Sequence, residues 1–263
     1  MIEQNDKQSN RTAVILRELR QTGSVSVDAL REQLDVSLAT VRRDLQDLER
    51  RGMLRRTHGG AVPIEPLFYE AFRHDQSFQD QLGMFAEEKR RIGQAASELV
   101  SAGEMIALTA GTTTTEVVRS LRSLSGITVV TNTVNVAMEL SNRKDINVFV
   151  TGGHLRGDWF SLVGKAAVAA MSGLFVDVMF VGVNGIDAQQ GLTCLNPDEA
   201  EINSTMVRQA KRKIAVADHS KLGVVTNWLI CPTDAIDMLI TDSGATAEMI
   251  APFLSKGIKV RQV

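Results

Sequence analysis

Between residue 86 and residue 263, short apolar runs alternate with segments whose apolar residues recur every three or four positions. The runs are apolar at almost every position, which is typical of strands that are buried on both faces. Because strands that alternate with helices pair in parallel and are covered on both faces, the pattern predicts an α/β domain with a mostly parallel sheet. We expect strands at Met105–Thr109, Ile127–Thr131, Asn147–Thr151, Val176–Val183, Lys213–Ala217, Asp237–Thr241 and Ile258–Arg261. We expect helices at Glu87–Val100, Thr113–Leu124, Val134–Asn142, Val163–Met171, Asp198–Lys211 and Ala247–Leu254.

The first 62 residues follow a different pattern, that of three short helices and a hairpin. Thr22-Gly23 breaks the first helix, and a tight turn at Asp35-Val36 separates the second helix from the third. A short turn between the second and third helices is the mark of a helix-turn-helix. We expect helices from Asn10 to Leu19, from Val27 to Leu34 and from Leu38 to Arg51.

The third helix separates a buried stripe from a polar outward face. Val41, Leu45 and Leu48 form the stripe, so the opposite side carries a small residue, a guanidinium and an amide. In the major groove, arginine pairs with guanine and glutamine with adenine, and hydroxyls at a helix N-terminus favour a phosphate. The residues expected to contact DNA from this helix and its cap are Ser37, Ala39, Thr40, Arg42, Arg43, Gln46 and Arg50.

An apolar–basic–turn–apolar order follows the third helix and predicts a small hairpin, or wing, with residues 58–60 at its tip. We expect Arg55, Arg56 and His58 to lie along the DNA backbone or minor groove. A simpler interpretation is that the arginines of the third helix are solvated and pair with the acidic residues between them. The cap, turn, helix and wing occur in the order that DNA binding needs, which favours a DNA-binding surface.

Charge is distributed unevenly along the chain. Residues 1–62 contain eleven Lys/Arg and nine Asp/Glu and carry +2, whereas the remainder contains 18 and 22 and carries −4, which gives the −2 of the chain. A basic N-terminal part is expected if only that part meets a polyanion. Two cysteines are too few for a disulfide framework, the N-terminus is polar, and no apolar run reaches the ~18 residues that span a bilayer. We therefore expect a cytoplasmic protein with no membrane contact.

Four polar loops follow predicted strands of the C-terminal part. The carboxyl ends of parallel strands meet at one edge of a sheet, where ligands bind. A glycine followed by threonines at a helix start suits a phosphate, because backbone N–H groups and hydroxyls converge there. A single polar turn is usually only a turn, but four at one edge favour a ligand site. The candidates in these loops are Gly111, Thr112, Thr113, Thr114, Thr131, Asn132, Asn135, Gly152, Gly153, Arg156, Asn184 and Asp187.

Two later segments add weaker candidates. Lys221 follows a further strand and can pair with a phosphate, although an isolated loop lysine is usually only solvated. Glu199 and Glu201 begin a helix, where the helix dipole alone favours acidic residues. These three side chains complete the set of expected ligand-binding residues.

Both parts of the chain resemble one known family. Arg11, Ile15 and Leu19, followed by the runs Ser37–Leu45 and Leu54–Ala61, resemble in type and spacing the DNA-binding signature of the DeoR family of bacterial sugar-metabolism regulators. The C-terminal part resembles that family's sensor domain over its full length. The resemblance implies a winged helix-turn-helix domain at 1–62, a linker at 63–85 and a sensor domain at 86–263 that is similar in fold to ribose-5-phosphate isomerase and the CoA transferases.

The resemblance also implies a function. It implies a repressor that binds double-stranded operator DNA as a homodimer or homotetramer and is relieved by a phosphorylated sugar. The segments Gly152–Arg156 and Asn196–Ala200 are most similar to the branch that controls amino-sugar (N-acetylgalactosamine-type) catabolism. The family often has an aspartate two residues before the glycine of the Gly-Thr-Thr loop, where this chain has Thr109.

A sugar-phosphate isomerase tethered to a helix-turn-helix is the alternative function. Isomerisation needs a base poised against the substrate carbon. The isomerase pattern resembles Asp-Gly-x-Asp followed by a Lys-Gly-Gly loop, but here the first aspartate position is Asn184 and residues 192–195 supply no lysine, although Asp187 remains. The four histidines have no metal-ligand spacing, and no cofactor is expected. The sequence therefore favours ligand binding over turnover.

Overall fold

The chain, described here from a computed structural model, divides into two compact units, residues 1–74 and 75–263, which we call the N-terminal and C-terminal units. The structure describes residues 11–63 and 81–263, except residues 13, 17, 20, 21, 51–53, 82, 122 and 123. The expected helix cap Asn10 and most of the expected linker, residues 63–85, lie outside the described residues.

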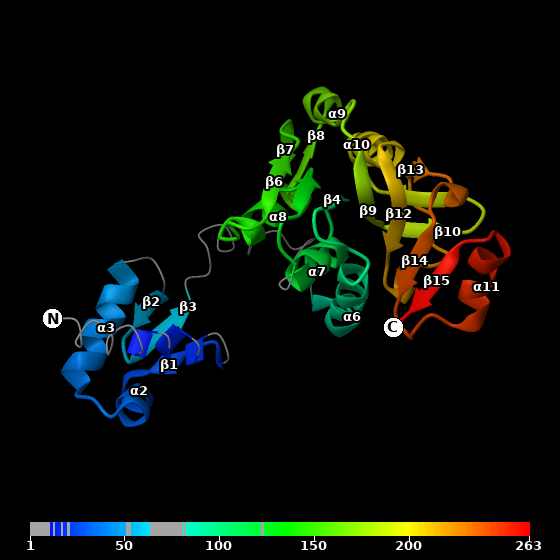
Figure 1. The fold of residues 1–263 in the computed structure, drawn as a ribbon. Helices are drawn as coiled ribbons and strands as arrows, with labels where there is room; N and C mark the ends of the chain where they lie inside the picture. Colours follow the sequence, from blue (N-terminus) through cyan, green and yellow to red (C-terminus); the bar gives the residue numbers. More distant parts are fainter. Residues whose placement is uncertain are drawn as a thin grey trace. The chain divides into compact units, whose positions relative to one another are not determined.

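The N-terminal unit is a helix-turn-helix with a small antiparallel sheet (Figure 1). Its labelled helices are α2 (Val27–Leu34) and α3 (Leu38–Arg50), and the described residues between 11 and 19 are also helical. Its strands β1 (Val25–Ser26), β2 (Leu54–Thr57) and β3 (Gly60–Pro63) have the order β1-β3-β2. The predicted helix-turn-helix and wing are therefore confirmed. The apolar core of this unit is formed by Ile15, Leu19, Val25, Leu30, Val41, Leu45, Leu48, Leu54 and Ala61.

The sequence does not predict β1, because a strand of two residues has no periodicity to detect. Val25 and Ser26 pair with Ala61 and Gly60 of β3. The expected position of Gly60 at the tip of the wing was wrong, since only His58 and Gly59 form the turn. A Cβ atom at Gly60 would lie 1.8 Å from the carbonyl oxygen of Val25, so a glycine is what lets β1 approach β3.

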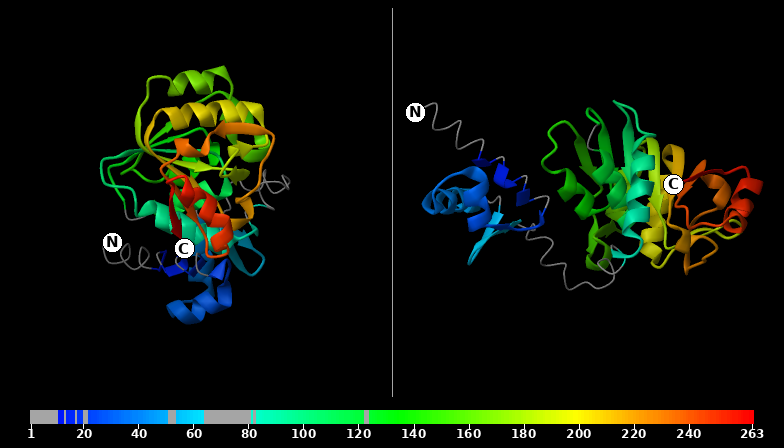
Figure 2. Two further views of the ribbon diagram at one scale, coloured as in Figure 1. Left: turned by 90° about the vertical axis from the view of Figure 1, so that its right-hand side faces the viewer. Right: turned by 90° about the horizontal axis from the view of Figure 1, so that it is seen from below.

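The C-terminal unit is built on a seven-stranded sheet of order β15-β14-β12-β9-β4-β5-β6 (Figures 1 and 2). Every neighbouring pair in this sheet is parallel, which confirms the predicted fold class. The strands are β4 (Met105–Leu108), β5 (Thr128–Thr131), β6 (Asn147–Val150), β9 (Val176–Gly182), β12 (Ala210–Val216), β14 (Met238–Thr241) and β15 (Lys259–Gln262). The helices are α6 (Ala86–Ser97), α7 (Thr112–Ser120), α8 (Val134–Leu140), α9 (Lys165–Met171), α10 (Pro197–Arg208) and α11 (Ala247–Ser255).

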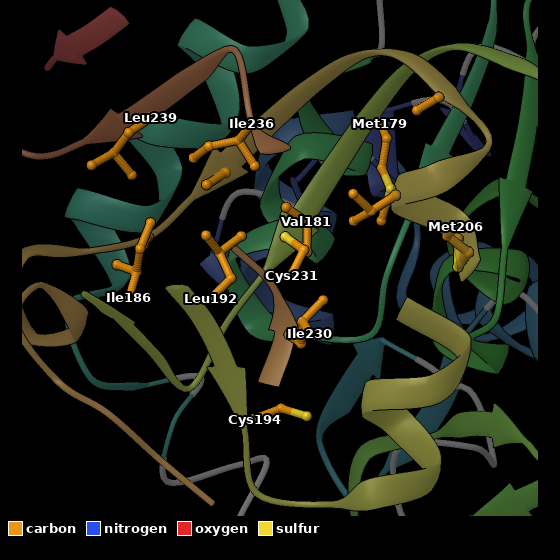
Figure 3. Close-up of a cluster of buried hydrophobic side chains, with 14 of the residues drawn as sticks. Met179, Val181, Ile186, Leu192, Cys194, Met206, Ile230, Cys231, Ile236 and Leu239 are labelled. Atoms are coloured by element: carbon orange, nitrogen blue, oxygen red, sulfur yellow. The ribbon is translucent and has the colours of Figure 1, made fainter. Parts of the chain in front are cut away.

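Alternate residues of the sheet enter two different cores, because successive side chains of a strand point to opposite faces. On β9, Val178 and Phe180 pack with α6, α7 and α8, while Met179 and Val181 pack with α9, α10 and α11. Figure 3 shows part of the second core, where Met179 and Val181 lie among side chains such as Met206 of α10. Both faces of the sheet are covered, as the continuous apolar strands predict.

A second, antiparallel sheet was not predicted. It has the order β10-β11-β13 and consists of β10 (Gly185–Asp187), β11 (Gly191–Cys194) and β13 (Trp228–Cys231). A hairpin of β7 (His154–Arg156) and β8 (Ser161–Val163) was also missed. These strands have three or four residues and follow glycine-rich loops, so their periodicity is too short to identify.

Two of the predicted helices extended into residues that form strands. Val163 was expected to begin a helix but ends β8, and α9 begins at Lys165. Lys211 was expected to end a helix but lies in β12, because α10 ends at Arg208 and the strand extends back to Ala210. The exposed Lys211 and Arg212 lie near the amino end of β12, beyond the buried core, and their polarity made this part of the strand look like the polar end of a helix.

Candidate functional site

In the N-terminal unit, α3 presents the polar face that the sequence predicts. Val41, Leu45 and Leu48 are buried, while Ala39, Arg42, Arg43 and Gln46 are exposed. At the start of the helix, the Ser37 hydroxyl accepts a hydrogen bond from the Thr40 backbone N–H at 3.2 Å and contacts the Thr40 hydroxyl at 2.9 Å. The side chain of Arg50 lies outside the described part of the structure.

Two of the acidic residues of α3, Asp44 and Glu49, form ion pairs with side chains outside this helix. Asp44 is buried and forms a two-pronged ion pair with Arg11, with the shorter contact, between Arg11 Nε and Asp44 Oδ2, at 2.6 Å. Glu49 instead pairs with Arg56 of the wing, whose Nε lies 2.7 Å from Glu49 Oε2. Both carboxylates therefore hold the unit together, and Arg42 and Arg43 form no ion pair with a described carboxylate.

The three wing residues expected to contact DNA are Arg55, Arg56 and His58. Arg56 is held by Glu49 through both its side chain and its backbone N–H, which fixes β2 against α3. Arg55 and His58 are exposed, and His58 lies at the turn between β2 and β3. Arg56, which is expected to contact DNA, thus has a structural partner within the unit.

In the C-terminal unit, the carboxyl ends of β9, β4, β5 and β12 surround one pocket, which we call the strand-end pocket. It contains about 620 Å³ of empty space, part of it open to solvent. Seven of the residues that the sequence predicts to bind ligand line it, namely Gly111, Thr112, Thr113, Asn132, Asn184, Glu199 and Lys221. The other lining residues are Gln81, Lys89, Ala110, Trp159, Gly182, Val183, Cys194, Asn203 and Asp218.

Two lysines, Lys89 of α6 and Lys221 after β12, form what we call the cationic end of the pocket. Lys89 is 2% exposed, and its Nζ donates a hydrogen bond to the backbone oxygen of Gln81. Lys221 Nζ donates to the side-chain oxygen of the same Gln81 at 3.3 Å. Burial lowers the pKa of Lys89, an effect that the negative charge of nearby Asp218 opposes.

The position of Lys89 depends on how closely two helices pack. Gly93 lies one turn after Lys89 on α6, and a Cβ there would come within 2.5 Å of the backbone of Glu116 on α7. The absence of a side chain lets α6 lie against α7, whose first turn forms the neighbouring wall of the pocket. The sequence analysis missed Lys89 because it lies in a run of charged residues. Its spacing from Ile92 and Ala96 on the buried side of α6 is the signal that identifies it as inward-facing.

The start of α7 supplies the wall beside the cationic end. Thr112 and Thr113 are buried and line the pocket, and the free backbone N–H groups of a helix N-terminus favour an anion there. Thr114 Oγ1 instead bonds to the carbonyl oxygens of Thr109 and Gly111, at 2.8 and 2.9 Å. The hydroxyl of Thr109 accepts a hydrogen bond from Gly182 N–H at 2.9 Å. Thr109 thus joins β4 to β9, at the position where the family often has an aspartate.

The remaining predicted residues are not brought to the pocket lining. Thr131 Oγ1 donates to the Leu108 carbonyl oxygen at 2.9 Å, and Asn135 Nδ2 donates to Thr115 Oγ1 at 2.9 Å. Asp187 accepts hydrogen bonds from the backbone N–H groups of residues 189 and 190, and Glu201 is exposed. These side chains have structural partners, or face solvent, instead of a ligand.

The loop after β6 also lies outside the lining. Gly152 is exposed, and Gly153 packs so closely that a Cβ there would lie 2.6 Å from the Val163 carbonyl oxygen. Arg156 Nη1 lies 3.9 Å from Glu199 Oε1, so this arginine acts on the pocket through a lining carboxylate.

The pocket lining includes one cysteine, Cys194. Burial raises the pKa of the Cys194 thiol to about 11, which leaves it protonated and poorly nucleophilic at neutral pH. Among the described residues, no three His, Cys, Asp or Glu side chains are grouped as metal ligands. In the same part of the chain, no helix has the length and apolarity needed to cross a bilayer.

Comparison with known proteins identifies both units. Residues 11–66 match the DeoR-like helix-turn-helix domain, and residues 84–243 match the DeoR C terminal sensor domain. The chain is 34% identical over 252 residues to the "Putative aga operon transcriptional repressor" of Escherichia coli O157:H7, which covers 96% of this chain and 93% of that protein. It is 38% identical over 235 residues to the "HTH-type transcriptional regulator GlpR" of Haloferax volcanii, covering 89% of this chain and 90% of the relative.

A solved structure of ribose 5-phosphate isomerase A from Methanocaldococcus jannaschii aligns with 52% of this chain and 54% of its own, at a TM-score of 0.38 and 16% identity. The matches to the two DeoR domains give the chain a DNA-binding part and a sensor part for a small molecule, and they confirm a regulator in place of the alternative isomerase. The chain belongs to the DeoR family of DNA-binding transcriptional regulators.

Proposed function

We propose that the protein represses an operon for the use of a sugar or amino sugar, and that a phosphorylated sugar bound in the strand-end pocket releases it from its operator. The observation that carries the proposal is the cationic end, where Lys89 and Lys221 lie beside the first turn of α7. Two ammonium groups and free helix N–H groups in a largely buried site suit a phosphate, which accepts several charge-assisted hydrogen bonds. Similarity to the aga operon repressor supports a sugar-related operon.

On the DNA side, we assign base contacts to Arg43 and Gln46 and phosphate contacts to Ser37, Thr40 and Arg42. The exposure of Arg42, Arg43 and Gln46 on one side of α3 supports this assignment. The excess of positive charge in residues 1–62 is only +2, so one N-terminal unit alone offers little electrostatic affinity. We therefore propose a homodimer or homotetramer whose paired units contact half-sites separated by one turn of DNA, about 10–10.5 bp, or a multiple of it.

Gln81 provides a route by which the ligand can act on the chain that leads to the N-terminal unit. Its backbone oxygen accepts from Lys89 and its side-chain oxygen from Lys221. A phosphate that binds both lysines competes with Gln81 for the same ammonium groups. Loss of these two bonds therefore releases Gln81, which directly follows residues 64–80 in the sequence. A ligand with different affinity for the two states shifts the balance between them, as a switch requires.

The test uses Trp159, which lines the pocket, as a reporter. Replacing the other tryptophan, exposed Trp228, by phenylalanine leaves a single fluorophore beside the ligand. We expect a phosphorylated sugar to change the fluorescence saturably, to raise the melting temperature, and to release operator DNA over the same concentration range. Lys221→Met should weaken ligand binding roughly tenfold or more, because a charge-assisted hydrogen bond contributes about 1.5–3 kcal/mol.

Lys256→Met is the matched control, since Lys256 is an exposed lysine at the end of α11 and outside the pocket lining. It should bind the ligand like the unmodified protein. The proposal is overturned if no phosphorylated sugar produces a saturable response, or if Lys256→Met weakens binding as much as Lys221→Met.

A further inference from the structure

Asn132 has an unusual environment at the end of β5. Its side chain has no exposed surface, and its Oδ1 and Nδ2 atoms are both buried without a hydrogen-bond partner among the described residues. Its backbone is well placed, since the carbonyl oxygen accepts from Leu162 N–H at 2.7 Å. A buried amide with no partner costs free energy, so its presence in the pocket lining needs an explanation.

The residues next to Asn132 do not share this property. Thr131 bonds to the Leu108 carbonyl oxygen, and Asn135 bonds to Thr115. These two buried side chains close to Asn132 are therefore paired, whereas both polar atoms of Asn132, which lines the pocket, are not. That combination points to a partner supplied by the ligand.

Helix α10 places two more acceptors at the same pocket. Glu199 and Asn203 are four residues apart, so they lie on one side of the helix, and both line the pocket. Asn203 Oδ1 is buried without a partner among the described residues. Glu199 Oε1 accepts from Ser161 Oγ at 2.6 Å, which leaves lone pairs on the carboxylate for further donors. We call Asn132, Glu199 and Asn203 the amide wall.

The amide wall offers more acceptors than donors. It presents the two side-chain oxygens of Asn132 and Asn203 and both oxygens of the Glu199 carboxylate, against the two amide nitrogens of the same asparagines. We propose that the amide wall binds the end of the effector opposite its phosphate, through hydrogen-bond donors carried by a neutral or amino sugar, and rejects a sugar acid. The inference rests on the proposed function, and it adds which class of phosphorylated sugar the pocket selects.

The preference for a neutral or amino sugar follows from which ligand groups can form hydrogen bonds with the amide wall. Hydroxyl groups both donate and accept, and an ammonium group donates, so either can satisfy Asn132, Asn203 and Glu199. A carboxylate at the same place has no proton to donate, leaves the two amide oxygens unpaired and meets the negative charge of Glu199. A site built to hydrogen-bond a donor discriminates strongly against an analogue that lacks it, because its own buried groups then stay unpaired.

Asn132→Leu tests the assignment. Leucine removes both orphaned polar atoms at similar size, so the unliganded protein should melt at a temperature equal to or above that of the unmodified protein. Binding of hexose 6-phosphates or hexosamine 6-phosphates of the gluco and galacto series should nevertheless weaken by roughly ten- to a hundredfold, as expected for lost hydrogen bonds to a buried group. Asn142→Leu, at an exposed asparagine just beyond α8, is the matched control and should bind normally.

The ligand arms separate the possible outcomes. The unmodified protein should bind at least one hexose 6-phosphate or hexosamine 6-phosphate at least tenfold more tightly than 6-phosphogluconate or inorganic phosphate. Tighter binding of the hexose phosphate identifies a hydroxyl group as the donor, and tighter binding of the hexosamine phosphate identifies an ammonium group. Tighter binding of 6-phosphogluconate, or unchanged sugar phosphate binding by Asn132→Leu, overturns this inference while leaving the proposed function standing. If the unmodified protein binds no phosphorylated sugar, the proposed function and the inference fall together.

Discussion

The two candidate sites of this protein are built in opposite ways. The DNA-facing side chains come from one helix, α3, and Arg42, Arg43 and Gln46 are already solvated. The strand-end pocket draws its side chains from seven separate parts of the chain, and most of its polar groups are buried. Exposed arginines lose little solvation when they meet DNA, whereas a buried lysine such as Lys89 has lost its solvation before any ligand arrives. A change in the protonation of Lys89 should therefore alter ligand affinity in the pocket and leave the operator affinity of α3 unchanged.

The largest expected effect concerns the DNA-binding surface alone. Arg43→Ala should reduce affinity for a two-half-site operator by at least roughly thirtyfold, because a bidentate arginine–guanine contact contributes about 1–3 kcal/mol and is lost from two units. Quantitative gel-shift titration measures it. Ligand binding should stay normal in the same variant. Lys256→Ala, which removes the same charge from the C-terminal unit, should keep full operator affinity, and an Arg43→Ala variant that does so too would show that α3 does not read the bases.

One site lies on a single helix and the other is assembled from separate segments, and this difference explains how much of each the sequence can predict. On α3, periodicity alone separates Val41, Leu45 and Leu48 from the outward face, so burial and function can be read from spacing. Most of the seven parallel strands are predicted for the same reason, since they contain apolar runs, although β15 (Lys259–Gln262) is largely polar. Strand β1 and the sheet of β10, β11 and β13 are too short to have a period, and only their pairing partners reveal them.

The pocket is predicted less completely because its residues meet only after folding. Gly111–Thr113 and Asn132 can be identified, since they directly follow apolar strands whose carboxyl ends must share one edge. Lys89 and Asn203 lie on helices, where nothing in their immediate neighbours marks them as pocket residues. Thr114 and Asn135 have the expected chemistry, but their hydrogen bonds go to Thr109 and Thr115. Residue type predicts the chemistry of such a site better than it predicts which residues face the ligand.

A smaller expected effect is the pH dependence of affinity, which should differ between the two sites. Burial lowers the pKa of Lys89, Lys221 lowers it further, and Asp218 and Glu116 oppose the shift. The charged form of Lys89 is therefore lost as pH rises through the lowered pKa, and affinity for a sugar phosphate should fall roughly tenfold across the alkaline range below the ordinary lysine pKa of about 10.4. Operator affinity should stay constant over that range, because the proposed base and phosphate contacts do not involve a lysine.

Fluorescence titration through Trp159 at a series of pH values measures this effect, and Lys89→Met is its control. The variant should bind the ligand weakly at every pH and should lose the alkaline decline. A decline of the same size in Lys89→Met would mean that the loss of charge on Lys89 does not cause it.

The smallest expected effect tests whether Gln81 competes with the ligand. Gln81→Ala removes the acceptor of Lys221 and leaves the backbone oxygen that accepts from Lys89. Because one net hydrogen bond contributes about 0.5–1 kcal/mol, freeing Lys221 should tighten sugar phosphate binding about two- to fivefold and lower the ligand concentration that releases the operator. Gln94→Ala, at an exposed glutamine of α6, should change neither quantity. Weaker ligand binding by Gln81→Ala would instead make Gln81 a ligand contact, and the link between the pocket and the segment that precedes it would then need a different route.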